Sequence, residues 1–219
     1  MWNSQVIIML LEGIRDTLYM TLASTLFGYI IGLPMGIVLT VTDKDGIRPN
    51  AAVYKVLDVI SNLLRCIPFI ILLIVLIPFT RFVVGRSYGS TATIVPLTIA
   101  AAPYIARMVE SSLKEVDAGV IEAARSMGAS DFQIVTKVML VEARTSLIVG
   151  ATISLGTILG YSAMAGTVGG GGLGDIAIRY GYTRWQTDIM VVTVVLLVIL
   201  FQIFQTIGMK IANRLDRRK

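Results

Sequence analysis

The chain has 219 residues, of which 55% are hydrophobic and only 15% are charged, and its mean hydropathy is +0.79. Soluble domains carry about 25% charged residues, so a water-soluble globule is excluded and an integral membrane protein is predicted. The single cysteine, Cys66, excludes an internal disulfide framework, and the lack of histidine removes the usual metal ligand and general base. We therefore expect no catalytic residue, no cofactor site and no metal site in this chain.

The charge-free stretches of the sequence predict an all-α protein with five membrane-spanning helices. A bilayer core about 30 Å thick needs about 20 apolar residues per helix. Five stretches reach or approach this length: 17–42, 58–81, 88–107, 145–167 and 188–209. The second stretch qualifies only if its helix starts near Asp58 and takes Arg65 into its first turns.

The distribution of basic residues predicts the orientation in the membrane. Lysine and arginine favour cytoplasmic loops, and most of the 19 basic residues lie inside if the C-terminus is cytoplasmic. We expect an outer, interfacial lead-in over residues 1–12, a transmembrane domain over 13–210 and a basic cytoplasmic tail over 211–219. Because topology accounts for this charge, no nucleic-acid partner is required.

Prolines and glycines recur within the predicted spans. The prolines are Pro34, Pro68, Pro78, Pro96 and Pro103. Each loosens its helix, which fits a bundle built to move but also fits the ordinary enrichment of proline in membrane helices. Gly28, Gly32 and Gly36 form two successive GxxxG steps, which favour close helix packing, with a pore-lining role as the alternative.

The sequence gives little support to transport powered by the chain alone. No acidic residue lies deep in a span, although proton-coupled carriers place a titrating group there. The glycine-rich run 166–174 is not followed by the GK[ST] sequence of a phosphate-binding loop, and it ends an apolar span on the expected outer face. If a nucleotide powers transport, the motor is another polypeptide.

The longest inner segment, residues 108–144, is predicted to contain two short amphipathic helices. Asp117 can cap the first helix, and Gly128 can end it. Its apolar stripe at helical spacing consists of Val120, Ala123, Ala124 and Met127. A helix pair on the inner membrane surface and a docking site for a partner protein both fit this pattern.

The second helix of this segment has a capping box at its start. Ser130 takes the N-cap position and Gln133 the reciprocal position three residues later. We expect Phe132, Val135 and Met139 to share one face of this helix.

The string Glu122-Ala123-Ala124-Arg125-Ser126-Met127-Gly128, followed by Val138 and Leu140, resembles the EAA loop of ABC importer permeases. That loop reads EAA, three residues, Gly, nine residues, Ile, one residue and Leu-Pro. Val138 replaces the isoleucine, and Val141 replaces the proline, so the second helix is free to continue toward Arg144. Strings around Pro68, Pro103 and 160–174 extend the resemblance to the permeases of bacterial methionine importers, over about residues 13–213.

This resemblance implies the type I ABC importer permease fold in a bacterial inner (plasma) membrane. It assigns ATPase coupling to Glu122, Ala123, Ala124, Arg125, Met127 and Gly128. It also implies a homodimer, two copies of a separate ATPase that holds ATP and Mg, and an extracytoplasmic methionine-binding lipoprotein, with membrane lipid around the chain. The translocation pathway is expected to pass Ser162, Ala163, Met164 and Ala165.

Three alternatives stay open from the residues. A permease for another small amino acid or related solute would have the same architecture. A small ion channel would need a filter, for which the glycine-rich run is the candidate. A membrane anchor of an electron-transfer complex would normally carry haem-ligating histidine, which this sequence lacks.

Overall fold

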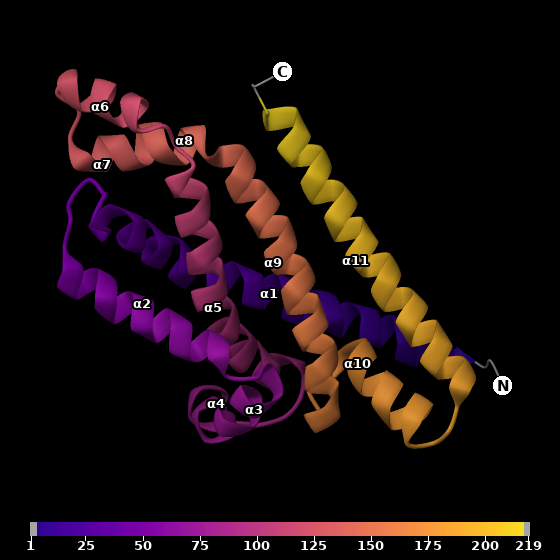
Figure 1. The fold of residues 1–219 in the computed structure, drawn as a ribbon. Coiled ribbons are helices and arrows are strands. Elements are labelled where there is room, and N and C mark those ends of the chain that lie inside the picture. The colour runs from indigo at the N-terminus through magenta and orange to yellow at the C-terminus, as the bar shows by residue number, and fades with distance from the viewer. Residues whose placement is uncertain (1–3, 217–219) are drawn as a thin grey trace. The chain divides into compact units, whose positions relative to one another are not determined.

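The computed structural model describes residues 4–216, and every secondary-structure element in this range is helical (Figure 1). Four helices are long and apolar enough to cross a membrane: α1 (Ser4–Thr42), α5 (Ser90–Lys114), α9 (Arg144–Ala165) with its continuation η2 (Gly166–Val168), and α11 (Thr187–Leu215). A fifth span exists if α2 (Ala51–Cys66) and α3 (Phe69–Val75), which are bent by 102° at their junction, count as one. The remaining elements are shorter: α4 (Ile77–Val84), α6 (Ala118–Ser126), α7 (Asp131–Gln133), η1 (Ile134–Met139), α8 (Leu140–Glu142), α10 (Gly172–Ile176) and η3 (Ala177–Tyr182).

The segment predicted as the second span is not one continuous helix starting near Asp58. Helix α2 begins earlier, at Ala51, and ends at Cys66, and the chain leaves the helical conformation at Pro68, whose ψ is 133°. Proline disfavours the helical conformation of the residue before it and has no N–H to donate, which explains the break. Pro78 lies in the first turn of α4, where a missing N–H costs nothing.

The chain divides into two compact units. Of the described residues, unit 1 contains 4–27, 67–101 and 155–205, and unit 2 contains 28–66, 102–154 and 206–216. Helices α1, α5, α9 and α11 each contribute residues to both units.

Unit 1 has an apolar core built by four helices. Its fully or almost fully buried side chains come from α1, α9, α10 and α11: Leu10, Leu159, Leu173, Ile176, Ile189 and Leu200. On α3 and α9, the rings of Phe69 and Tyr161 stack with their centroids 4.6 Å apart. Burial of this apolar surface and the stacked ring pair hold unit 1 together.

The glycine-rich run 166–174 is a packing element of unit 1. The Leu173 N–H donates to the Thr17 hydroxyl at 2.9 Å, and the Thr93 hydroxyl donates to the Gly170 carbonyl at 3.2 Å. A Cβ at Gly172 would lie 2.7 Å from Thr17 Oγ1, so only glycine fits this close approach. Polar groups of the run are thus bonded to α1 and α5 and do not form an open cradle for an anion.

Close packing of α1 against α5 organises unit 2. A Cβ at Gly32 would lie 2.6 Å from the Ala102 carbonyl oxygen, and one at Gly36 would lie 2.5 Å from that of Ala106. The second GxxxG step of α1 therefore faces α5 at backbone distance, which confirms the predicted packing role for these two glycines.

Candidate functional site

The first helix of the loop between α5 and α9 forms as its sequence predicts. The Asp117 carboxylate accepts a hydrogen bond from the Gly119 N–H at 2.7 Å and caps α6. Gly128 follows the helix with a φ of +81°, a conformation that residues with a Cβ rarely adopt. This glycine turns the chain back, so α6 lies beside the segment formed by α7 and η1 (Figure 1).

The second helix of the loop confirms its predicted start and corrects its predicted face. Ser130 and Gln133 form the capping box, with the Ser130 N–H donating to Gln133 Oε1 at 2.9 Å. After α7, however, the chain continues as the π-helical segment η1, whose hydrogen bonds span five residues instead of four. Residues five apart then share a face: Ile134 and Met139 are buried, whereas Phe132 is 77% exposed. The predicted face of Phe132, Val135 and Met139 is therefore wrong.

Most of the predicted apolar stripe of α6 faces outward. Ala124 is buried, but Val120 is 42% exposed and Met127 is 82% exposed. Glu122, Ala123 and Arg125 are also exposed. Because a fixed apolar surface at a loop tip is costly in water, the exposed side of α6 has the properties of a surface that a partner covers.

The other side of α6 and α7 is attached to the loop between α1 and α2, residues 43–50. Arg125 donates to the Ile47 carbonyl at 3.1 Å, and Arg48 pairs with Asp131 at 3.2 Å. A cavity of about 430 Å³ lies between α6, the 43–50 loop and the end of α5, and Glu122 lines it together with Arg125. Both helices of the loop are therefore held from one side and free on the other.

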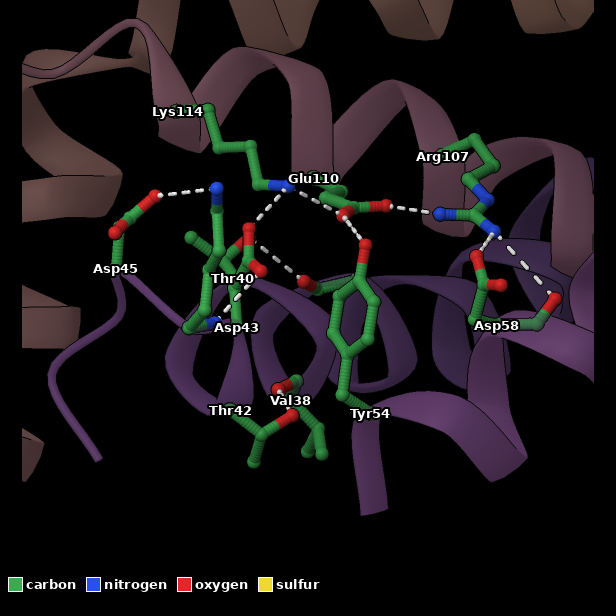
Figure 2. A network of polar contacts seen from close by, with 12 residues as sticks. Val38, Thr40, Thr42, Asp43, Asp45, Tyr54, Asp58, Arg107, Glu110 and Lys114 are labelled. Atoms are coloured by element: carbon green, nitrogen blue, oxygen red, sulfur yellow. Dashed lines mark hydrogen bonds and ion pairs between the residues drawn. The ribbon is translucent and has the colours of Figure 1, made fainter. Parts of the chain in front are cut away.

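A network of charged side chains lies at the end of α5 (Figure 2). Arg107, Glu110 and Lys114 follow one another at helical spacing on one face of α5, and Glu110 accepts from Arg107 at 2.7 Å and from Lys114 at 2.8 Å. Lys114 also pairs with Asp43 at 2.6 Å, and Arg107 pairs with Asp58 on α2. The network thus joins α5 to α2 and to the 43–50 loop.

The charged side chains of this network neutralise one another. Glu110 is only 5% exposed, and burying a lone carboxylate would cost several kcal/mol, but two cations flank it. The hydrogen bond from Lys114 holds the pKa of Asp43 below its ordinary value of 3.8. Glu110 is therefore stabilised by two cations of its own helix, and each of these cations also has an anionic partner from another part of unit 2.

Arg107 and Lys114 are among the basic residues expected on the cytoplasmic side, and their distribution alone did not predict this network. The i, i+3, i+7 spacing of Arg107, Glu110 and Lys114 was the available signal, because it places three charges on one helical face. Asp58 lies 49 residues before Arg107, and Asp43 lies 71 residues before Lys114. No local pattern reveals these pairings.

The predicted pathway residues lie on α9 in unit 1, whereas the predicted coupling residues lie in unit 2. Ser162 and Ala165 are buried, and the Ser162 hydroxyl donates to the Leu159 carbonyl at 2.7 Å. Ala163 is half-buried, and Met164 is 50% exposed. The four residues are therefore brought together on one helix end but do not share one face.

A second cavity of unit 2, of about 750 Å³, lies between the α5–α6 connection, the start of α9 and the end of α11. Its charged lining residues include Glu115, Asp117, Glu142 and Arg144. Within residues 4–216, no group of three or more Cys, Asp or Glu side chains is placed to hold a metal ion.

Comparison with known proteins identifies the family. Residues 19–219 match the family described as "Binding-protein-dependent transport system inner membrane component". The chain belongs to this family. Members are inner-membrane components of transport systems, in agreement with the apolar helices of this chain and with its resemblance to ABC importer permeases.

Individual relatives within the family are similar over most of their length. The chain is 48% identical over 210 residues to the probable D-methionine transport system permease protein MetI of Vibrio cholerae, covering 96% of this chain and 93% of the relative. It is 54% identical over 158 residues to the D-methionine transport system permease protein MetI of Escherichia coli, covering 72% and 73%.

The fold is similar to that of a chain in a solved structure of inward-facing conformations of the MetNI methionine ABC transporter. The TM-score is 0.97 at 49% sequence identity, with 99% of this chain and all of that chain covered. The predicted fold class, an all-α membrane protein with the permease fold of this family, is confirmed.

Proposed function

We propose that this chain is the membrane-spanning permease subunit of an ATP-driven importer of methionine. The observation that carries the proposal is the match to the MetNI methionine ABC transporter, which extends over 99% of the chain at a TM-score of 0.97. The relatives named D-methionine permeases support the same substrate and point to the D-isomer. The chain itself performs no hydrolysis, and a separate ATPase subunit supplies the energy.

Two copies of the chain would form a homodimer around a central pathway, with two ATPase subunits on the cytoplasmic side and a methionine-binding lipoprotein outside. This arrangement takes the C-terminus as cytoplasmic and the N-terminus as external. ATP-driven closure of the ATPase pair would displace the two α6 helices and move the permease between inward-open and outward-open states. The different affinities of the two states for the ATP-bound ATPase would drive the change.

Helix α6 is the proposed contact with the ATPase. Ala123 and Ala124 keep this helix slim, Glu122 offers a carboxylate to a basic partner residue, and the exposed Met127 offers apolar contact area. Gly128 provides the turn that exposes the end of the helix. The other side of α6 is attached to the 43–50 loop. This attachment allows α6 to pass a displacement by the ATPase on to the rest of unit 2 without unfolding.

For the translocation pathway, the exposures favour Met164 and Ala163 over their neighbours. Ser162 and Ala165 are fully occupied by contacts within unit 1, whereas half of the Met164 surface is free to face a pathway. A brief apolar route is sufficient for methionine if the external binding protein supplies the selectivity.

The proposal is tested by co-purifying the chain with its ATPase and measuring uptake of labelled D- and L-methionine into proteoliposomes. We expect Glu122→Lys and Gly128→Pro to lower ATPase binding and ATP-dependent uptake by about tenfold or more, since each removes a feature of the α6 surface. Glu12→Lys changes an exposed glutamate of unit 1 in the same way and should leave ATPase binding unchanged. Undiminished uptake in both loop variants, or methionine uptake by the chain without the ATPase, would contradict the proposal.

A further inference from the structure

The 43–50 loop is bonded to three other parts of unit 2. Its Ile47 carbonyl accepts from Arg125 on α6 at 3.1 Å, and its Arg48 pairs with Asp131 on α7 at 3.2 Å. Its Asp43 pairs with Lys114 at the end of α5 at 2.6 Å. A displacement of α6 and α7 therefore acts on the 43–50 loop as well as on the chain segment that joins α5 to α6.

Glu110 connects this attachment to α2. Its Oε1 accepts from Lys114 at 2.8 Å, and its Oε2 accepts from Arg107 at 2.7 Å, so one carboxylate bridges two cations (Figure 2). Arg107 in turn bonds Asp58 and, at 3.2 Å, Asn62, which lies one helical turn before Cys66 at the end of α2. A continuous series of polar contacts thus runs from α6 to the end of α2.

Burial makes the ion pairs of Glu110 difficult to break. Glu110 is 5% exposed, and the side chain of Arg107 is 15% exposed, so neither can exchange its partner freely for water. Pulling Lys114 or Arg107 away from Glu110 would leave this buried carboxylate with one cation instead of two, which is more costly than breaking an exposed ion pair. The bridge therefore favours joint movement of the elements that it connects.

We infer that Glu110 is a positioning residue that makes α2 follow the displacement of α6, by bridging Lys114 and Arg107 between the 43–50 loop and α2. The inference rests on the proposed function, because the ATPase supplies the displacement. Helix α6 is joined covalently to α5. The bridge through Glu110 adds a second, noncovalent connection, which runs from α6 through the 43–50 loop to α2. The α2 helix ends at the bend before α3, so its movement reaches the segment that contains Pro68.

The decisive variant is Glu110→Gln. It leaves Arg107 paired with Asp58 and Lys114 paired with Asp43, so the remaining two cations and two anions still balance and folding should be retained. The glutamine amide has one acceptor oxygen instead of two and no charge, so it cannot accept from Arg107 and from Lys114 on separate oxygens as Glu110 does. Glu115→Gln is the matched control, because Glu115 is exposed and lies five residues further along the chain.

Cys66 provides the reporter, since it is the only cysteine of the chain, is exposed, and ends α2. It is spin-labelled in the full complex with cysteine-free partner subunits, and the label-to-label distance in the homodimer is measured before and after trapping with ATP and vanadate. We expect trapping to change this distance in the wild type and in Glu115→Gln, and to change it by about half as much or less in Glu110→Gln. Glu110→Asp should recover part of the response.

An unchanged response in Glu110→Gln, no response in the wild type, or loss of ATPase co-purification in Glu110→Gln would overturn the inference. The labelled wild-type complex is also assayed for methionine uptake. A normal label response without methionine uptake would contradict the proposed substrate and leave the role of Glu110 supported, so the two failures are distinguishable.

Discussion

Both units bring backbones close together at glycines, but unit 2 adds a network of paired charges between its segments. In unit 1, the run 166–174 approaches its neighbours at backbone distance, and threonine hydroxyls bond its backbone at Leu173 and Gly170. In unit 2, charges on α5 are bonded to charges on α2 and on the 43–50 loop around the buried Glu110. Unit 1 therefore depends on the absence of side-chain volume, whereas unit 2 depends on it at Gly32 and Gly36 and also depends on paired charge.

The difference follows from the cost of burying polar groups. A hydroxyl bonded to the backbone satisfies both partners without placing a net charge in a low-dielectric interior. An ion pair must offset the desolvation of two charges, and it becomes strongly unfavourable when one partner is removed. Added volume at a close glycine contact should thus be damaging in both units, and loss of a buried charge should be damaging in unit 2.

The largest expected effect is that of Arg107→Leu in unit 2. It leaves Glu110 buried without its arginine and Asp58 without its cation, so the free energy of unfolding should fall by about 3 kcal/mol. Thermal unfolding of the purified protein in detergent measures the change. Arg48→Leu removes an arginine of an exposed pair and should cost less than about 1 kcal/mol; equal losses in the two variants would refute the distinction between buried and exposed pairs.

The corresponding change in unit 1 is Gly174→Ala. A methyl group there would clash with the backbone of Ala163, which cannot move aside as a flexible side chain could, and we expect a loss of about 2 kcal/mol in the same unfolding assay. Gly160→Ala on α9 meets no atom within 4 Å and should be neutral or slightly stabilising. If both alanines are tolerated, volume is not what limits unit 1.

A smaller effect is expected at the turn after α6. Gly128 has a φ of +81°, and an added Cβ there meets no neighbouring atom, so Gly128→Ala tests backbone strain alone. We expect a loss of about 1 kcal/mol in the free energy of unfolding. Gly128→Asn should cost less, because asparagine tolerates this conformation better, and the reverse order would show that strain is not the cause.

The smallest effect is the pH dependence carried by Asp43. Because its pKa lies below the ordinary 3.8 in the folded chain, its pair with Lys114 stabilises the fold at higher pH and is lost as the pH falls through the lowered pKa. The difference in unfolding temperature between the wild type and Asp43→Asn should be constant from about pH 8 to about pH 5 and should shrink below pH 3.8. A difference that grows on acidification would contradict this assignment.

Local patterns predicted the loop well where local interactions form it. The Asp117 cap, the turn at Gly128 and the capping box at Ser130 depend on residues within three positions of one another, and all three are present. The face of the second helix was mispredicted because Ile134–Met139 adopts π-helical hydrogen bonding. The sequence of these six residues does not distinguish the two hydrogen-bonding patterns, and the buried contacts of Ile134 and Met139 decide between them.

The break in the predicted second span was also only partly predictable from the sequence. The sequence contains Pro68 and therefore indicates a weak point, yet proline is also present inside α1 and α5 without interrupting them. Neighbouring helices can satisfy the carbonyl that a proline frees, so the outcome at each proline depends on what surrounds it. The early start of α2 at Ala51 was likewise hidden, because Lys55 and Asp58 interrupt the apolar pattern used to find spans.

Composition and spacing were sufficient to determine that this chain is a helical membrane protein, to locate its long apolar helices and its capped loop, and to indicate its family through the spaced EAA pattern. These features depend on residues close together in the chain, where sequence and geometry correspond directly. The tertiary structure alone decided which charges meet between segments: Arg107 and Lys114 on α5 pair with Asp58 on α2 and with Asp43 after α1. Only the folding of these elements onto one another brings those partners within hydrogen-bonding distance.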